Sequence, residues 1–375
     1  MPVTDRQHSG DFNVALNGYR GVCALLVYFY HLGSAGVVAW PAGSPANDAA
    51  TYLWSSLRYG VEMFFMISGF VILGSLLRHS TVGGFLKDRV IRIYSAWVPA
   101  LIAVTVIGVA FKIRLFATVT PVETLGLFVA NFFLLPPLVH MPMIHAVSWS
   151  LSYEWVFYLA AAIGVLLYRY APQRKWDKVL WLALAAAFIC AFPRALFFVT
   201  GVIVFRHRQW FVQHKRWLGW PVVSFAVFLI AWRYTDVGKA HFSYTMLDMV
   251  FDGRWIGAVV AFVAALHMFA SVCLNASRQV AFLSSRTFQF LGLISYSFYL
   301  WHSLVMSVVK RVVIPHVVPH YGVSVGFIVF ALATLAIAIP LSWASWALFE
   351  VRIAKLVRRA FTRQSRPLPR AVNAH

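Results

Sequence analysis

The sequence predicts an all-α protein that crosses a membrane about ten times. Of its 375 residues, 61% are hydrophobic and only 12% are charged, and the mean hydropathy is +0.74. A soluble domain is about half apolar and about a quarter charged, whereas a disordered chain contains few aromatic residues. Here 17% of the residues are aromatic. The composition therefore excludes both classes and favours a polytopic membrane protein.

Ten apolar stretches are candidate spans, since a span needs about 20 mostly apolar residues. They lie near 14–33, 59–77, 94–111, 147–168, 179–192, 195–205, 218–234, 255–275, 290–309 and 323–349. A further stretch, 124–138, is short and ends at Pro136-Pro137, so we expect a re-entrant or interfacial segment. The predicted organisation is a cytoplasmic N-terminal segment (1–13), a membrane domain (14–349) and a basic cytoplasmic tail (350–375).

The distribution of basic residues supports this topology. Lys and Arg outnumber Asp and Glu by 32 to 12, which gives a net charge of +20. With ten spans and a cytoplasmic N-terminus, cytoplasmic segments carry 22 of the basic residues and outer segments carry nine, while Arg20 lies inside the first span. Both termini are then cytoplasmic, as the positive-inside rule favours. Sorting and attraction to anionic headgroups explain the charge, so we expect no nucleic-acid partner.

The three cysteines carry no sign of a disulfide or a metal site. Cys23, Cys190 and Cys273 lie in apolar runs and lack a Cys-x-x-Cys spacing. We therefore interpret all three as buried small residues.

Several ionisable residues lie at membrane depth, where each is costly and so indicates function by default. Arg20 and His31 are eleven residues apart in the first span. Eleven helical steps turn through about 1100°, so the two side chains share a face and lie about 16 Å apart along the axis. We expect a line of polar groups facing the bundle interior, with Arg20 on the cytoplasmic side. His267, a lone histidine in another span, has only a structural interpretation.

Two carboxylates could orient the imidazole of His31 and fix its tautomer. Glu62 enters the second span at about the depth of His31, and Glu154 lies two turns into a later span. The sequence does not choose between them. On the cytoplasmic side, Arg89 and Arg92 are three residues apart and project to one side of a helix. Paired guanidinium groups suit phosphate, although each arginine alone would be interpreted as a headgroup anchor.

These residues stand in six motifs that follow one another along the chain. The motifs are Arg20-Gly21 followed by His31, the stretch Gly60–Phe70 with Glu62 and Ser68, Arg89-x-x-Arg92-Ile93, Trp149-Ser150-Leu151-Ser152-Tyr153-Glu154, Arg194 with Phe197-Phe198, and the stretch Ser295–His302 with Tyr299. Together they resemble the integral membrane acyltransferases of family 3, which O-acylate surface polysaccharides and related glycans. One departure is Ser95, which stands where the family commonly has a proline.

The resemblance implies an acyl-CoA co-substrate, most often acetyl-CoA, that comes from the cytoplasm, with no tightly bound cofactor and no metal. It implies a glycan or lipid-linked glycan acceptor at the outer face, as in polysaccharide O-acetylation and exopolysaccharide biosynthesis. It also implies a multi-pass protein of the bacterial cytoplasmic (inner) membrane. No hydrolase-like domain follows the membrane region, so we expect the stand-alone form.

Each candidate residue then has an expected role. Arg89 and Arg92 would bind the nucleotide phosphates, Arg20 would line the path of the pantetheine arm, and His31 would act as general base on the acceptor hydroxyl. Glu154 or Glu62 would orient His31. Substrate-contacting or supporting roles are expected for Ser68, Trp149, Ser152, Tyr153, Arg194, Tyr299 and His302.

Other mechanisms and functions stay open at this level. His31 could instead act as a nucleophile that carries the acyl group. A transporter or flippase for an anionic or lipid-linked glycan would also place polar residues inside a bundle. However, the sequence lacks the symmetrical pair of Gly/Pro-broken spans that is typical of inverted-repeat carriers. A membrane scaffold would leave the register of Arg20 and His31 unexplained.

Overall fold

The computed structural model describes residues 4–37, 45–236 and 244–364, and all of the regular structure in these ranges is helical. The α-helices are α1 (Thr4–Gly33), α2 (Pro45–Ser56), α3 (Gly60–Arg78), α4 (Val82–Ala110), α5 (Pro121–Phe132), α6 (Trp149–Tyr170), α7 (Lys175–Ala191), α8 (Leu196–Arg206), α9 (Arg208–Gln213), α10 (Pro221–Thr235), α11 (Met246–Phe251), α12 (Trp255–Cys273), α13 (Arg286–Ser345) and α14 (Ala354–Gln364). Short 3-10 turns join several of them, and a π-helical turn (Trp346–Ile353) connects α13 to α14.

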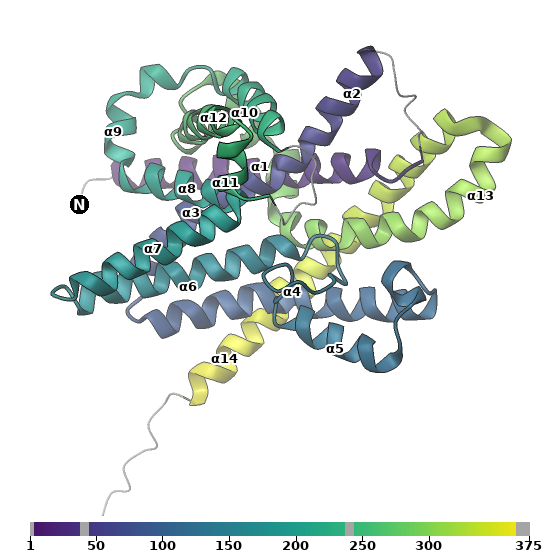
Figure 1. Cartoon of the computed structure of the whole chain (residues 1–375), viewed down its shortest axis with the longest axis horizontal. Coiled ribbons are helices and arrows are strands. Elements are labelled where there is room, and N and C mark those ends of the chain that lie inside the picture. The colour runs from purple at the N-terminus through teal and green to yellow at the C-terminus, as the bar shows by residue number, and fades with distance from the viewer. Residues whose placement is uncertain (1–3, 38–44, 237–243, 365–375) are drawn as a thin grey trace, which may run out of the picture.

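The all-helical prediction is confirmed, and each of the ten apolar stretches falls on a helix. The last two stretches belong to α13, which is broken at Gly322, where φ is 81°, and folds into the hairpin at the right of Figure 1. Among the described residues, five helical runs are long and apolar enough to cross a membrane. They are Asp48–Arg78, Val82–Ala117, Trp149–Tyr170, Trp255–Cys273 and Arg286–Phe361. Ten spans with both termini inside stays a prediction.

The predicted cytoplasmic segments gather at one end of the molecule. The turn between α3 and α4 and the turn between α6 and α7 lie at the same end as the start of α1, at the left of Figure 1. The end of α1 and the hairpin of α13 lie at the opposite end. This arrangement agrees with the asymmetry of basic residues along the sequence.

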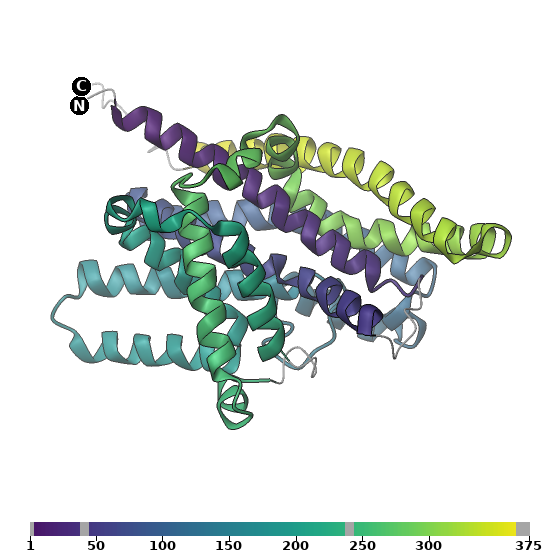
Figure 2. The same cartoon turned by 90° about the horizontal axis from the view of Figure 1, so that it is seen from above.

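Not all of the helices share one direction. Figure 2 shows α10 and α12, in green, running across α1 and α13, and Figure 1 shows the same pair nearly end-on. The two helices pack closely on each other, and Gly257 of α12 lies against the backbone of Ala231 of α10. A count of apolar stretches carries no information about this crossing, because it treats every stretch as an independent span.

The 124–138 segment forms a short helix followed by a long irregular loop. Helix α5 begins at a capping box in which Thr120 and Glu123 bond reciprocally, and its 12 residues are about 18 Å long. A membrane interior is about 30 Å thick, so α5 is too short to cross it alone. Asn131, at the end of α5, bonds the carbonyl of Pro142 and the amide of Ile144. These bonds tie the loop after α5 to the helix.

The prediction for the cysteines is correct for two of the three. Cys23 and Cys273 are buried, but Cys190 is exposed. Cys190 lies on α7, a helix with no buried residue. In a membrane protein an apolar helix can face lipid, because hydrocarbon tails are as apolar as leucine side chains. An apolar surrounding sequence therefore does not establish burial within the protein.

Small residues bring the central helices close together. Helix α1 packs along α13 and α3, and α3 packs along α8. A Cβ atom added at Gly69 of α3 would overlap the carbonyl of Phe198, and one added at Gly201 of α8 would overlap the carbonyl of Met66. This close contact matters for the site, because α3 carries Glu62 and Ser68, and Arg194 immediately precedes α8.

We expect Gly201→Ala to destabilise the protein by about 1–3 kcal/mol, because the added methyl group forces α3 and α8 apart. The thermal unfolding midpoint of the detergent-purified protein measures this effect. Gly126→Ala is the matched control, since nothing lies within 4 Å of a Cβ atom at Gly126. Alanine also favours a helix over glycine, so the control should unfold at the wild-type temperature or slightly above. Equal midpoints for the two variants would contradict the close packing of α3 on α8.

Candidate active site

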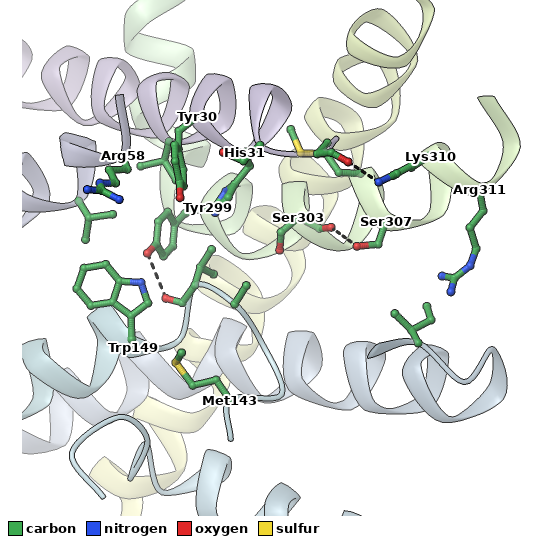
Figure 3. A pocket seen from close by; sticks show the side chains of 18 of the residues that line it. Tyr30, His31, Arg58, Met143, Trp149, Tyr299, Ser303, Ser307, Lys310 and Arg311 are labelled. Carbon is green, nitrogen blue, oxygen red and sulfur yellow. Dashed lines mark hydrogen bonds between the residues drawn. The ribbon is translucent and has the colours of Figure 1, made fainter. Parts of the chain in front are cut away.

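An elongated cavity of about 860 Å³ lies at the end of α1 that carries His31. We call it the outer cavity. Figure 3 shows it extending from Arg58 and Trp149 to Lys310 and Arg311, with His31 between them. Its volume is within the usual range for a ligand site. The side chains come from the end of α1, the 3-10 turn before α3 and the start of α3, the turn after α4, the loop before α6 and its first residue, the turn before α8, and α13. The polar ones are Tyr30, His31, Ser34, Arg58, Trp149, Arg194, Tyr299, Ser303, Ser307, Lys310 and Arg311.

A second, smaller cavity of about 220 Å³ lies toward the start of α1. We call it the inner pocket. Its lining includes three arginines and one carboxylate, Arg20, Arg89, Arg92 and Glu154, together with Ser68, Ser150, Tyr158, Tyr296 and Tyr299. The inner pocket and the outer cavity share the side chains of Val61 and Tyr299. The two cavities therefore adjoin at these residues.

The predicted common face of Arg20 and His31 is confirmed, because both contact α13. Nε of Arg20 donates to the hydroxyl of Ser295 over 3.2 Å. Nδ1 of His31 lies 2.8 Å from Nε2 of His302. Arg20 belongs to the inner pocket and His31 to the outer cavity. One face of α1 thus lines both cavities.

The hydrogen bonds of His302 determine the tautomer of His31. Nδ1 of His302 lies 2.8 Å from the carbonyl oxygen of Phe298, which can only accept, so this nitrogen carries a proton. His302 is completely buried, which favours the neutral ring, and its Nε2 is then an acceptor. Nδ1 of His31 must donate to it. When the ring of His31 is neutral, Nε2 is therefore the nitrogen without a proton, as a general base requires.

The two carboxylates make their hydrogen bonds elsewhere and none with His31. Glu62 is completely buried, pairs with Arg194 over 3.2 Å, and accepts from Nε1 of Trp232 over 3.1 Å. Glu154 accepts from Ser68 over 2.8 Å and from the hydroxyl of Tyr158. The structure thus places Glu62 behind the outer cavity and Glu154 in the inner pocket. The hydrogen-bond partner of Nδ1 of His31 is His302 and neither carboxylate.

A buried ion network stands at one end of the outer cavity. Asp236 lies 2.8 Å from Arg58 and 2.8 Å from Arg194, and Arg194 also pairs with Glu62. The guanidinium group of Arg194 lies over the ring of Trp149, 5.1 Å from its centroid. The positive charges of Arg58 and Arg194 are therefore balanced by the negative charges of Asp236 and Glu62. Sequence reasoning did not identify Arg58 or Asp236, although an acid at the end of an apolar helix was a signal for Asp236.

Two of the three arginines of the inner pocket donate to hydroxyl groups. Besides the bond from Arg20 to Ser295, Arg89 donates to Ser75 over 3.0 Å. Glu350 was not identified from the sequence because it lies just beyond the last apolar stretch. It accepts from Ser297 over 2.7 Å and interacts electrostatically with both Arg20 and Arg92. The three arginines of the inner pocket therefore lie near two carboxylates, Glu154 and Glu350, and the charges sum to a net positive charge.

The loop before α6 holds Tyr299 between the two cavities. The hydroxyl of Tyr299 donates to the carbonyl of Val147 over 3.1 Å and lies 2.9 Å from the hydroxyl of Ser150. His145, which sequence reasoning missed in a loop without any motif, donates from Nε2 to the carbonyl of Leu300 over 2.8 Å. The loop is thereby bonded to α13 next to Tyr299.

Two of the expected supporting residues are structural in their contacts. Ser152 is buried and donates to the carbonyl of Pro136, over 2.5 Å. Tyr153 is buried among aromatic rings, and those of Phe65, Trp149 and Phe192 lie within 6.0 Å of it. Neither residue lines the outer cavity or the inner pocket. Both residues lie between Trp149 and Glu154 in the first turns of α6.

The arrangement can serve a reaction between two molecules that approach from opposite ends. The inner pocket offers guanidinium groups to a phosphate-bearing molecule. The outer cavity offers an imidazole, hydroxyl groups and an aromatic ring to a polar molecule. Within the described residues, no group of three or more His, Cys, Asp or Glu side chains could hold a metal ion.

Comparison with known proteins identifies the family. A family model described as an acyltransferase domain, that of acyltransferase family 3, matches residues 13–346. No curated protein and no solved structure gives a significant match. The matched range contains all three arginines of the inner pocket, His31 and His302, and nearly the whole of the predicted membrane domain. The chain therefore belongs to the acyltransferase 3 family and is an acyltransferase.

Proposed function

We propose that the protein transfers an acyl group, with acetyl as the leading candidate, from cytoplasmic acyl-CoA to a hydroxyl group of a surface or exported glycan. The observation that carries this proposal is the position of His31. His31 lines an outer cavity that adjoins a pocket containing three arginines, and its Nδ1 lies against His302, which leaves Nε2 as the candidate base of the neutral ring. The proposed location is the bacterial cytoplasmic membrane, with the inner pocket facing the cytoplasm.

The inner pocket is the proposed donor site. Arg89 and Arg92 bind the phosphates of acyl-CoA, which as polyanions match the net positive charge of the pocket. The pantetheine arm passes Arg20 and reaches the boundary formed by Val61 and Tyr299. A volume of about 220 Å³ holds only part of acyl-CoA, so the nucleotide lies at the mouth of the pocket.

The outer cavity is the proposed acceptor site. A sugar hydroxyl donates to Nε2 of His31, and its oxygen attacks the thioester carbonyl carbon. His31 takes the proton, a carbon–oxygen bond forms, and the carbon–sulfur bond breaks. The CoA thiolate then receives the proton, which restores His31. His302 positions His31 by accepting from its Nδ1, and it also stabilises the imidazolium that forms.

A single-step transfer needs no acyl-enzyme. The competing mechanism has Nε2 of His31 attack the thioester and carry the acyl group to the acceptor. Both mechanisms require the same tautomer, so they predict the same loss when His31 is replaced. Trapping of an acylated His31 in the absence of acceptor would separate them.

We expect His31→Ala to abolish transfer, because among the described residues no other side chain that lines the outer cavity is an imidazole. The measurement is acetyl-CoA turnover by detergent-purified protein, followed as release of free thiol. His214→Ala is the control, since His214 is partly exposed, lies outside both cavities, and bonds through its ring to the carbonyl of Trp210 one turn earlier. Wild-type turnover in His31→Ala, with an intact thermal midpoint, would overturn the catalytic assignment.

We expect His302→Gln to lower the turnover number at least about tenfold, because positioned acid–base groups contribute about 10²–10⁴-fold in rate. The KM for acyl-CoA should stay within about twofold, since His302 lies outside the inner pocket. The ascending limb of the pH–rate profile should also move, which loss of packing alone would not cause. His316→Gln, an exposed position on the same helix, is the control. An unchanged pH profile would argue against the positioning role.

Arg89→Ala should mainly weaken donor binding, by about tenfold or more in the dissociation constant of acyl-CoA. Isothermal titration with a non-hydrolysable acyl-CoA analogue measures this. Lys87→Ala removes a cation from the same turn of α4, but Lys87 is exposed, faces Phe361, and is not part of the pocket. Normal donor affinity in Arg89→Ala combined with lost turnover would contradict the phosphate role.

A further inference from the structure

The outer cavity contains more positive charge than its ion pairs can balance. Its charged lining residues are Arg58, Arg194, Lys310 and Arg311, and no Asp or Glu of the described chain lines it. Asp236 and Glu62 lie behind the cavity wall and pair with Arg58 and Arg194. The surplus is therefore located at the other end, where Lys310 and Arg311 lie.

The surplus charge stands on the same helix as His302. Lys310 donates to the carbonyl of Ala35, which anchors its amino group at the cavity but leaves its charge unbalanced. Arg311 is exposed, and no acidic side chain of the described residues forms a salt bridge with it. Figure 3 shows both side chains at the end of the cavity away from Trp149. A planar guanidinium group there can form a bidentate contact with a carboxylate or a phosphate.

Hydroxyl groups connect this end of the cavity to the reaction site. Ser303, Ser307 and Arg311 follow one another at intervals of four residues, so they share one face of α13. The distance along the helix axis from Ser303 to Arg311 is about 12 Å. Ser303 directly follows His302 in the sequence. The side chains of Ser303, Ser307 and Arg311 all line the outer cavity. A small substituent on the sugar that carries the reacting hydroxyl group is too short to span this distance.

We propose that the acceptor is an anionic glycan, whose carboxylate or phosphate group binds Arg311 and Lys310 while a hydroxyl group on another sugar unit meets His31. This inference rests on the proposed function, because it names the class of acceptor for the same cavity. The elongated shape of the cavity accommodates a chain of sugar units, and Ser303 and Ser307 offer hydrogen bonds between its two ends.

A different explanation is that Lys310 and Arg311 only anchor α13 at the membrane surface. Long cationic side chains commonly extend toward headgroups from the ends of spans. In that case neither residue would affect binding of a soluble glycan, whatever its charge. The two explanations therefore predict different results with matched charged and neutral ligands.

The test compares binding of three trisaccharides to the detergent-purified full chain at low ionic strength, by thermophoresis of the labelled protein. The probes are cellotriose, cellotriose oxidised to a carboxylate at each C6 position, and cellotriose with one phosphate at its reducing end. We expect at least one anionic probe to bind about tenfold more tightly than cellotriose, and this preference to weaken with added salt. The anionic probe that binds more tightly identifies the group that is recognised.

Arg311→Gln should remove most of this preference, whereas Arg286→Gln, the same change at the other end of α13, should keep it. Equal affinity for charged and neutral probes, including no measurable binding of any of them, would overturn the inference, as would a preference that survives in Lys310→Gln/Arg311→Gln. Acetyl-CoA turnover of wild type and His31→Ala, measured on the same preparations, tests the proposed function separately. A charge preference that depends on Arg311 in a protein without turnover would support the anion subsite and reject only the proposed chemistry.

Discussion

The contact between α1 and α13 is the constraint on which both cavities depend. Asn17 bonds the backbone and side chain of Gln289, and the side chain of Gln289 bonds back to the carbonyl of Val14. Gly292 allows the two backbones to approach, since a Cβ atom there would overlap the carbonyl of Asn17. These contacts set the register of the two helices at the half of α1 that carries Arg20. With the register set, Arg20 meets Ser295 and His31 meets His302.

The buried charges of the site are arranged so that each lies beside an opposite charge or a hydroxyl group. A charge transferred from water into a protein interior costs several kcal/mol unless it is paired and hydrogen-bonded. Arg194 meets this condition through Glu62 and Asp236, and Arg89 is held by Ser75. Loss of one partner in such a pair costs about 3–5 kcal/mol. The ion network therefore fixes the wall of the outer cavity beside His31, the proposed base.

The division into two cavities suits an enzyme that joins molecules from opposite sides of a membrane. A continuous polar passage would let ions cross, whereas here Tyr299 stands between the two spaces and is bonded to Ser150 and Val147. In the proposed reaction, only the thin acyl-bearing arm of acyl-CoA has to pass this residue. The larger acceptor and the charged nucleotide can each remain at its own end. The proposal therefore makes catalysis depend on the alignment of the two substrates at His31.

The sequence by itself determined the helical class, the positions of the long apolar helices, and the shared face of Arg20 and His31. These properties follow from local rules, because apolar length and helical periodicity act within a single segment. Tertiary structure alone decided the partner of His31, the pairing of Glu62 with Arg194, and the involvement of Asp236. Those contacts join residues far apart in the chain, and Glu62 and Glu154 look equivalent until α3, α6 and α8 are packed. The exposure of Cys190 and the crossing of α10 and α12 also depend on packing, because an apolar stretch does not reveal whether it will face lipid or protein.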